Sequence, residues 1–486
     1  MAVRDVWIKK IGQHRGRPRL FLDGLQAVRA GFSPGQRFDV EVDGRRVVIS
    51  RNQDGSRVVS SRKKGPSQTP VVDINSAELL AAFEGMDAIR VVVAPDRVYL
   101  LPLASQARKV ERVQRLAGKL ATGQALAAGS VAHGGGVLAH AVHTGLRDAG
   151  IDCTLEFANE LRDDLLEQAI VHNDIWSEDT AALALPMQEL AQDEWLLANL
   201  PRLELLEMGL PCSGASIAGH TKKGLQKMED HEQVGHLVYS ALVIISKTNP
   251  AVVLLENVPR YADTASAAIL RAQFRDMGYK TAEFLLDGQD FGALEKRIRW
   301  CMVATTHGVE IDLQDLAPPV RLVRRLAEVL EPDIGPDDPR WSEVQYLKDK
   351  EARNAAVGDR FKMQFVDASS TSVPTLRRHY NKGGSSDPRL RHPDPQRPEL
   401  SRLLTPVEHA GVKGVPPSLI AGLARTTAHE LLGQGIAYEP FRAVGARIGQ
   451  CLAQAAERLR QGHTQLGDVE DESGEQVLYR RQSITG

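Results

Sequence analysis

Between about residues 122 and 305 the chain alternates short apolar runs with longer amphipathic stretches. This alternation is typical of a parallel β-sheet whose strands are joined by crossover helices. Residues 250–255 (PAVVLL) read as a buried strand, and residues 203–210 read as another that stops at glycines and prolines. We therefore predict an open α/β sheet, in which ligand and catalytic groups collect at the carboxyl ends of the strands.

Polar tracts follow both of these predicted strands. Pro211-Cys212 follows the strand predicted at residues 203–210. Glu256, which opens an ENVP tract, follows the strand predicted at residues 250–255 and lies 44 residues after the cysteine. A cysteine and a glutamate at one edge of a sheet can act as a nucleophile and an acid/base group. A third tract supplies Arg297 and Arg299 ahead of another apolar run. Any one of these tracts alone would be an ordinary structural feature. It is their occurrence together, in this order, that indicates a catalytic site.

Composition excludes several classes of protein. No run approaches 18 apolar residues, and the start (MAVRDVWIKK) lacks a signal-peptide core, so we expect a cytoplasmic, nucleoid-associated protein with no membrane segment. No CxxC pair occurs, which argues against a zinc module or a disulfide framework, and we expect no metal site. The cysteines are widely spaced: Cys153, Cys212, Cys301 and Cys451.

The amino-terminal part of the chain is basic. Residues 1–65 contain 15 Lys/Arg against 6 Asp/Glu, whereas the whole chain has a net charge of −2. A basic module on a nearly neutral chain suggests a polyanionic partner, although a solvated charged surface would have the same composition.

Residues 1–105 read as short strands and turns. Asp43-Gly44 predicts a hairpin turn, and residues 85–99 echo the pattern of residues 35–49. The tract from 31 to 49 (GFSPGQRFDVEVDGRRVVI) resembles the swapped-hairpin DNA-binding modules of the AbrB and SymE type, which implies DNA binding and a possible dimer. A generic small β-barrel is the alternative. Residues 51–69 read as an exposed basic loop.

Over about residues 122–460, the tracts resemble those of the DNA cytosine carbon-5 methyltransferases in order and spacing. Residues 402–416 also follow that family's RxLTxxExA…GFP pattern. The resemblance implies an α/β, Rossmann-like methyltransferase that uses S-adenosyl-L-methionine. We predict a basic β-rich module (1–105), a catalytic domain (122–305), an inserted target-recognition domain (306–400), a C-terminal part that completes the catalytic domain (401–461) and a flexible acidic tail (462–486).

The resemblance implies a set of cofactor contacts. A glycine-rich turn after a strand lets the backbone approach a ligand at a helix amino end, and an acid ending the next strand can accept from ribose hydroxyls. A further acid would contact the adenine amino group, and a Gly-Gln pair near the C-terminus would open a helix near the methionine end. The implied cofactor residues are Gly134, Gly135, Gly136, Glu160, Asp179, Pro211, Gly433 and Gln434.

The catalytic roles implied are those of a thiol that adds to carbon 6 of cytosine and an acid that holds the base. Cys212 would be the nucleophile, and Glu256, when protonated, would donate to the ring nitrogen, assisted by Arg297 and Arg299. The chain departs from the family pattern at three positions, Ser213, Ala215 and Glu295, where the last replaces a glutamine. These departures leave the reaction rate and the substrate base open.

The segment between the two methyltransferase parts is rich in proline, glycine and arginine. Arginine can read guanine in the major groove of duplex DNA, and lysine mainly neutralises phosphate. The candidate DNA contacts are Arg377, Arg378, Tyr380, Lys382, Arg389 and Arg391. Two alternatives to double-stranded DNA methylation remain at this point: methylation of RNA cytosine, and a DNA-binding regulator with a degenerate methyltransferase domain.

Overall fold

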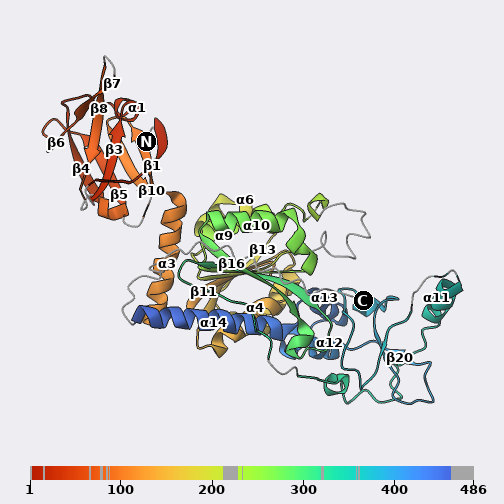
Figure 1. The fold of residues 1–486 in the computed structure, drawn as a ribbon. Coiled ribbons are helices and arrows are strands. Elements are labelled where there is room, and N and C mark those ends of the chain that lie inside the picture. The colour runs from red at the N-terminus through yellow and green to blue at the C-terminus, as the bar shows by residue number, and fades with distance from the viewer. Residues whose placement is uncertain are drawn as a thin grey trace. The chain divides into compact units, whose positions relative to one another are not determined.

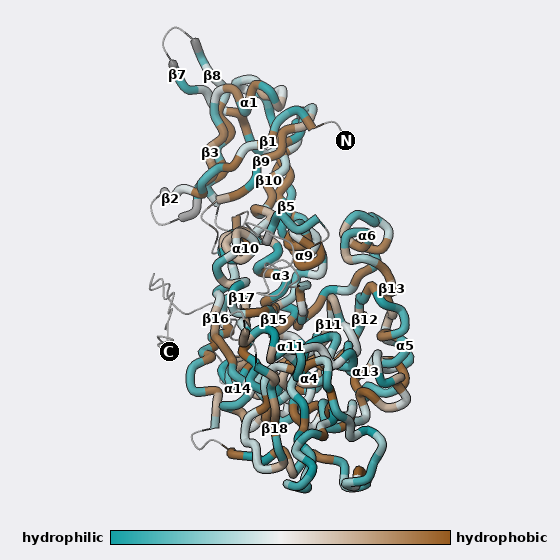
Figure 2. Tube along the Cα trace, turned by 90° about the vertical axis from the view of Figure 1, so that its right-hand side faces the viewer, coloured by the Kyte–Doolittle hydropathy of each residue, from teal (hydrophilic) through white to brown (hydrophobic). Residues whose placement is uncertain are grey.

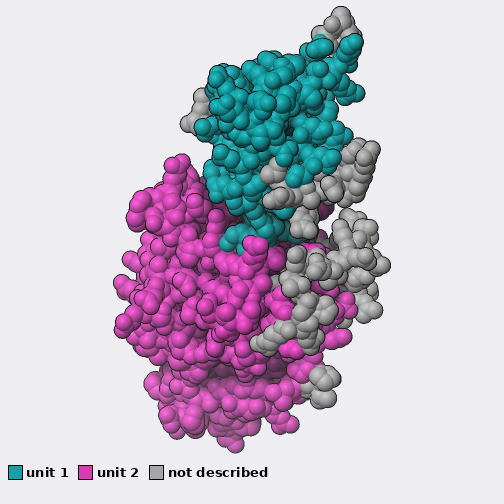
Figure 3. Space-filling model, turned by 90° about the vertical axis from the view of Figure 1, so that its left-hand side faces the viewer, with its two compact units in different colours: residues 1–111 teal, residues 112–486 magenta. Residues whose placement is uncertain are grey.

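The computed structural model describes residues 3–14, 17–64, 67–76, 80–83, 86, 88–211, 228–232, 234–318, 322–356, 358 and 362–460. The chain divides into two compact units, residues 1–111 and residues 112–486, which Figure 3 shows in two colours. The division falls within helix α3 (Ala104–Thr122). Each unit has a hydrophobic core of its own.

The second unit is built on a seven-stranded sheet with the order β13-β12-β11-β14-β15-β17-β16 (Figure 1). Its strands are β11 (Leu126–Val131), β12 (Cys153–Glu160), β13 (Ala181–Ala184), β14 (Leu205–Gly209), β15 (Val252–Asn257), β16 (Tyr279–Asp287) and β17 (Ile298–Thr306). The first five strands in that order are parallel, and β17 runs antiparallel to both of its neighbours, β15 and β16. The predicted α/β, Rossmann-like fold is confirmed.

The chain reverses its direction of travel across this sheet between β11 and β14. From β11 it continues to β12 and β13 on one side, and it then returns to β14 and β15 on the other. Such a switch point opens a crevice at the carboxyl ends of the two central strands, which is where open α/β sheets bind ligands.

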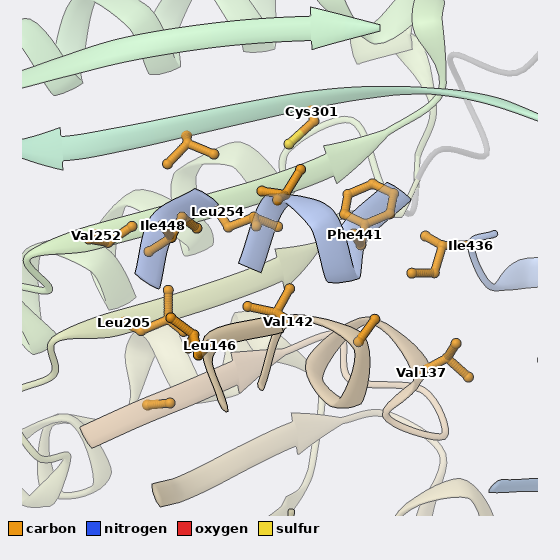
Figure 4. Packing of buried hydrophobic residues seen from close by; sticks show 14 of the residues in the cluster. Val137, Val142, Leu146, Leu205, Val252, Leu254, Cys301, Ile436, Phe441 and Ile448 are labelled. Atoms are coloured by element: carbon orange, nitrogen blue, oxygen red, sulfur yellow. The ribbon is translucent and has the colours of Figure 1, made fainter. Parts of the chain in front are cut away.

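Helices cover both faces of the sheet (Figure 1). One face carries α4 (Val137–Asp148) and α14 (Tyr438–Arg460), and the other carries α9 (Leu237–Thr248) and α10 (Ala265–Asp276). Figure 4 shows Phe441 and Ile448 of α14 packed between α4 and the strands, near Val142 and Leu254.

Helices α4 and α14 approach each other closely because each presents a glycine at the contact. A Cβ atom on Gly145 would lie 2.0 Å from the carbonyl oxygen of Arg442, and one on Gly445 would lie 2.3 Å from that of Val142. Any side chain at either position would force the two helices apart.

Residues 326–404 contribute most of a smaller core beside the large sheet. It includes Trp341, Val373, Tyr380 and Leu390, all buried. Its strands and helices are η5 (Leu326–Val329), α11 (Gln345–Ala356), β18 (Phe365–Val366), β19 (Arg389–Arg391) and β20 (Ser401–Arg402). The chain then returns to the catalytic sheet through α12 (Pro406–Lys413) and α13 (Arg425–Gln434).

The first unit contains a six-stranded sheet and a four-stranded sheet. The six strands, in sheet order, are β1 (Asp5–Lys10), β9 (Ala88–Ala94), β10 (Arg97–Pro102), β5 (Arg46–Arg51), β4 (Arg37–Asp43) and β6 (Arg57–Val58); the four are β2 (Gly12–His14), β3 (Arg17–Asp23), β8 (Ser67–Ile74) and β7 (Ser60–Lys64). The predicted hairpin turn after Asp43 is confirmed, since β4 and β5 pair across it. The prediction of a loop over residues 51–69 is wrong, because this stretch contains β6, β7 and part of β8.

The described helices include none that is long and apolar enough to cross a lipid bilayer. Within the same residues, no group of three or more His, Cys, Asp or Glu side chains could hold a metal ion.

Candidate active site

A glycine-rich turn follows β11 at the carboxyl edge of the sheet. Ala132, Gly134 and Gly136 have φ angles of 54°, 57° and 76°, so this turn depends on left-handed backbone that glycine adopts without strain. The N–H of Gly134 donates to Oε2 of Glu160 (2.7 Å), and the N–H of Arg162 donates to Oε1 (3.2 Å). The structure therefore brings the predicted glycines and Glu160 together.

The chemistry around this turn suits a ligand that carries hydroxyls, an apolar ring and a negative charge. Glu160 is only partly buried, and its carboxylate has lone pairs beyond the two used by backbone N–H groups. Leu161, next in the chain, is 67% exposed and offers an apolar surface. Gly136 is the N-cap of helix α4 and no side chain caps this end, which leaves amino-terminal N–H groups for an anion. These residues fit the adenosine and carboxylate parts of S-adenosyl-L-methionine.

Helix α13 packs directly on the glycine turn. A Cβ on Gly135 would lie 2.3 Å from Cδ1 of Leu431, so only glycine leaves room for this contact. Gly433 and Gln434 were predicted to open a helix, but they end α13. Their carbonyls accept from Nη2 of Arg297 at 3.0 and 3.4 Å. Their backbone thus holds a predicted catalytic arginine.

The assignment of Asp179 to the cofactor is wrong. Asp179 precedes β13, and β13 runs parallel to β12 with Ala184 beside Glu160. Asp179 therefore lies at the amino end of its strand, on the order of 15 Å from the carboxyl edge along the strand direction. The positions that reach the cofactor edge are at the end of β13, where the carbonyls of Leu183 and Leu185 accept from the buried amide of Asn159.

The tracts that contain the cysteine and the glutamate lie on neighbouring strands. Gly209 of β14 pairs with Glu256 of β15, so the two strands end side by side. The buried side chain of Asn257 donates to the carbonyl of Leu210 (3.0 Å) and so fixes the backbone that enters Pro211. Cys212, Ser213 and Ala215 lie outside the described residues. Pro211, the last described residue of this tract, stands at the switch point of the sheet.

Glu256 is held by an arginine from the antiparallel strand β17. Nε of Arg299 lies 2.8 Å from Oε1 of Glu256, and both side chains are mostly buried. Burial raises the pKa of Glu256, while the positive charges of Arg299 and Arg297 oppose that rise. A carboxyl group with a raised pKa keeps its proton to higher pH, which suits an acid that donates to a bound base.

The glutamate that replaces the family's glutamine is compensated by a buried lysine. Oε2 of Glu295 lies 2.7 Å from Nζ of Lys413, and Oε1 accepts from the N–H of Leu376 at 2.7 Å. Both side chains of the ion pair are fully buried. Burial opposes ionisation of Glu295, but Lys413 and Arg297 outweigh it and lower the pKa of this carboxyl group. The pair links the segment before β17, helix α12 and the segment that leads to Arg377.

Breaking this ion pair is expected to destabilise the second unit. Lys413→Met should lower the free energy of unfolding by about 3–5 kcal/mol, because the buried Glu295 carboxylate loses its nearest cation and keeps only Arg297, at 3.5 Å. The double variant Glu295→Gln/Lys413→Met should recover most of that loss, because it removes both charges of the pair while Arg297 keeps its bonds to the carbonyls of Gly433 and Gln434. Urea denaturation of the wild type, both single variants and the double variant measures the coupling. If the loss in the double variant equals the sum of the two single losses, the Glu295–Lys413 interaction contributes no coupling energy to stability.

The predicted DNA contacts separate into buried and exposed residues. Tyr380 is fully buried, and its hydroxyl donates to Pro388 and accepts from the N–H of Leu404. Arg389 is 6% exposed and donates to Ser401. Both assignments are therefore wrong, since these side chains hold the small core together. The exposed members of the set are Arg377, Arg378, Lys382 and Arg391.

The exposed arginines have intramolecular partners that hold them in place. Arg377 is paired with Asp387 (2.8 Å), and the guanidinium group of Arg391 lies over the ring of Phe365, 4.4 Å from its centre. Arg378 lies 4.0 Å from Glu430 of α13.

Comparison with known proteins gives consistent results for sequence and structure. Residues 141–450, more than half of the chain, match the family model of the C-5 cytosine-specific DNA methylases. The type II methyltransferase M.NlaX of Neisseria lactamica is 26% identical over 270 residues, which cover 54% of this chain and 81% of that enzyme. M.MspI of a Moraxella species is also 26% identical, over 55% of this chain and 61% of that enzyme.

Among solved structures, the Dnmt2 methyltransferase of S. pombe has the same fold. It matches with a TM-score of 0.52 and 18% sequence identity, over 68% of this chain and 99% of that protein. The chain thus belongs to the C-5 cytosine-specific DNA methylases, a family of DNA cytosine-5 methyltransferases that use S-adenosyl-L-methionine as the methyl donor.

Proposed function

We propose that this protein methylates carbon 5 of a cytosine flipped out of double-stranded DNA, through a covalent bond to Cys212. The observation that supports the proposal is the pairing of Gly209 with Glu256, because Gly209 stands two residues before Pro211, which precedes Cys212, and Glu256 is mostly buried at the end of the neighbouring strand. The arrangement supports a nucleophile and an acid acting on one base.

The residues of the chain would act in sequence. The thiolate of Cys212 adds to carbon 6 of the flipped cytosine while protonated Glu256 donates to the ring nitrogen, so that electron density moves toward carbon 5. Arg299 orients the Glu256 carboxyl group, and Arg297 is anchored by the carbonyls of the last two residues of α13. Loss of the carbon 5 proton then lets the bond to Cys212 break.

The cofactor would lie across the glycine turn at the carboxyl edge. Glu160 would accept from the ribose hydroxyls, Leu161 would contact the adenine ring, and the amino end of α4 would face the carboxylate. When bound there, S-adenosyl-L-methionine supplies the methyl group that carbon 5 accepts. Gly135 keeps the turn open to α13, since any side chain would meet Leu431.

Two further parts of the chain would bind the DNA. Residues 306–400 would form the target-recognition domain, with Arg377, Arg378, Lys382 and Arg391 on its surface. Residues 1–105 would add a basic module whose positive charge attracts the phosphate backbone. The type II names of M.NlaX and M.MspI favour a modification enzyme of a restriction system.

Substrate choice is tested with the purified protein and methyl-labelled S-adenosyl-L-methionine. Duplex DNA of mixed sequence and total cellular RNA are offered in equal nucleotide amounts, separately and together. Label is expected in DNA cytosine, with incorporation into RNA at least about tenfold lower. Label confined to RNA would assign the enzyme to RNA cytosine, and cofactor binding without transfer to either would favour the regulator.

A further inference from the structure

The strands β7 and β8 form a narrow ribbon that extends beyond the four-stranded sheet (Figure 2). Strand β3 pairs with residues 71–74 of β8, and its contact ends where the N–H of Gly24 donates to the carbonyl of Pro70 (3.2 Å). Beyond that point the ladder continues with Arg62 opposite Thr69, Lys63 opposite Gln68 and Lys64 opposite Ser67. Among the described strands, no third strand pairs with this part of the ribbon.

This ribbon is basic on both of its faces. Side chains of successive residues in a strand point to opposite faces, so Arg62 lies on one face and Lys63 on the other. Residues 55–72 contain no Asp or Glu, but they contain Arg57, Arg62, Lys63 and Lys64. A surface that only needed to be soluble would not require one sign of charge throughout.

Several arginines elsewhere in the first unit are neutralised more closely than Arg62 of the ribbon. Arg19 is paired with Asp73, and Arg51 lies 2.6 Å from Asp96. Arg62 is 66% exposed and 3.9 Å from Asp23, a carboxylate that Lys9 approaches at 3.8 Å. The ribbon therefore presents positive charge that this unit does not use for its own stability.

The dimensions of the ribbon match the major groove of B-form DNA. A two-stranded antiparallel ribbon is one of the elements that this groove admits, and the groove is about 8.5 Å deep. Three cross-strand pairs extend about 10 Å, enough to reach the base edges. Lysine and arginine bind guanine and phosphate oxygens, and glutamine binds adenine. The major groove of duplex RNA is too narrow for side chains to read.

We infer that the β7–β8 ribbon enters the major groove of duplex DNA, where Arg62 and Lys63 contact phosphates or guanines and Gln68 reaches a base edge. This places a second DNA contact in the first unit, in addition to the exposed arginines of residues 377–391. The inference rests on the proposed function only in taking duplex DNA as the substrate, because binding is measured without methyl transfer.

The test uses the full-length protein with Arg62→Gln/Lys63→Gln as the ribbon variant. The matched control is Arg45→Gln/Arg97→Gln, which removes the same charge from two exposed arginines, one in the turn after β4 and one at the start of β10. Binding to a duplex of mixed sequence is measured between 50 and 200 mM salt. We expect the ribbon variant to bind at least about tenfold more weakly and to lose about two units of the salt slope, against at most about threefold for the control.

Dimethyl sulfate footprinting on one target duplex then locates the contact, since this reagent reports on guanine N7 in the major groove. Protection is expected with the wild type and with the control, and it should be reduced with the ribbon variant. Equal weakening of the two variants, or protection confined to the minor groove, would overturn the inference, as would tighter binding of the wild type to duplex RNA.

A parallel assay of 5-methylcytosine formation separates the two proposals. Ribbon-dependent footprints without any methyl transfer would leave the ribbon assignment standing and remove the proposed function. Methyl transfer with identical footprints for both variants would support the proposed function and overturn the ribbon assignment. Thermal unfolding of each variant confirms that the exposed substitutions leave the fold unchanged.

Discussion

Replacing Cys212 with alanine is expected to lower methyl transfer to DNA by at least about a thousandfold, while cofactor and DNA binding change by less than about threefold. Carbon 5 of cytosine is a weak nucleophile until a group adds to carbon 6, and a thiolate is suited to that addition. Single-turnover transfer of labelled methyl groups to a duplex measures the loss. Cys153→Ala is the matched control, because Cys153 is a partly buried cysteine at the opposite end of β12 from Glu160.

The covalent step has a direct readout of its own. When fluorine replaces the hydrogen at carbon 5 of the target cytosine, no proton can leave, so the bond to the thiol should persist after methylation. A complex that survives denaturing electrophoresis is expected for the wild type and for Cys153→Ala, and it should be absent for Cys212→Ala. Turnover by Cys212→Ala at more than about a tenth of the wild-type rate would remove this thiol from the reaction.

Replacing Glu256 with glutamine is expected to lower the rate of methyl transfer by about 10²–10⁴-fold, with little change in the affinity for the cofactor. Glutamine keeps the shape of the side chain and can still contact Arg299, but it has no carboxylic acid proton to give to the ring nitrogen. The matched control is Glu283→Gln, which changes another strand glutamate that is paired with an arginine, Arg271, at 2.6 Å.

The pH dependence of the wild type follows from the direction of the Glu256 shift. Burial raises the pKa of this carboxyl group above its ordinary value of 4.5, so the folded protein binds the proton more tightly than the unfolded chain does. The contribution of Glu256 to stability therefore falls as the pH rises from 4.5 through the raised pKa. The single-turnover rate should fall over the same upper limb, and that limb should be missing in Glu256→Gln. An unchanged pH profile in this variant would assign the proton to another group.

The sequence was sufficient to predict the catalytic sheet and the meeting of its strand ends. Apolar runs such as residues 250–255 have few alternatives to a buried strand, and parallel strands necessarily bring the groups after their carboxyl ends to one edge. The adjacency of Gly209 and Glu256 follows from that rule. The ionic contact of Arg299 with Glu256 is a consequence of β17 running antiparallel beside β15.

The errors arose where tertiary packing decides the role of a side chain. Tyr380 and Arg389 stand in a stretch rich in glycine and proline that looks like a solvated loop, yet they form part of a small core. Asp179 precedes its strand by two residues, which places it at the wrong edge. Lys413 lies 118 residues from Glu295, so no local pattern could connect them. The sequence signal was the glutamate at residue 295 in place of the family's glutamine, because a charge at a buried position needs a partner of opposite charge.

Nucleoside mass spectrometry of plasmid DNA tests the central claim most directly. The plasmid is prepared from cells that lack cytosine methylation and express either the wild type or Cys212→Ala. The account predicts 5-methylcytosine with the wild type and none with Cys212→Ala. Plasmid DNA without 5-methylcytosine in the wild-type sample, at normal protein levels and with cofactor bound, would contradict it.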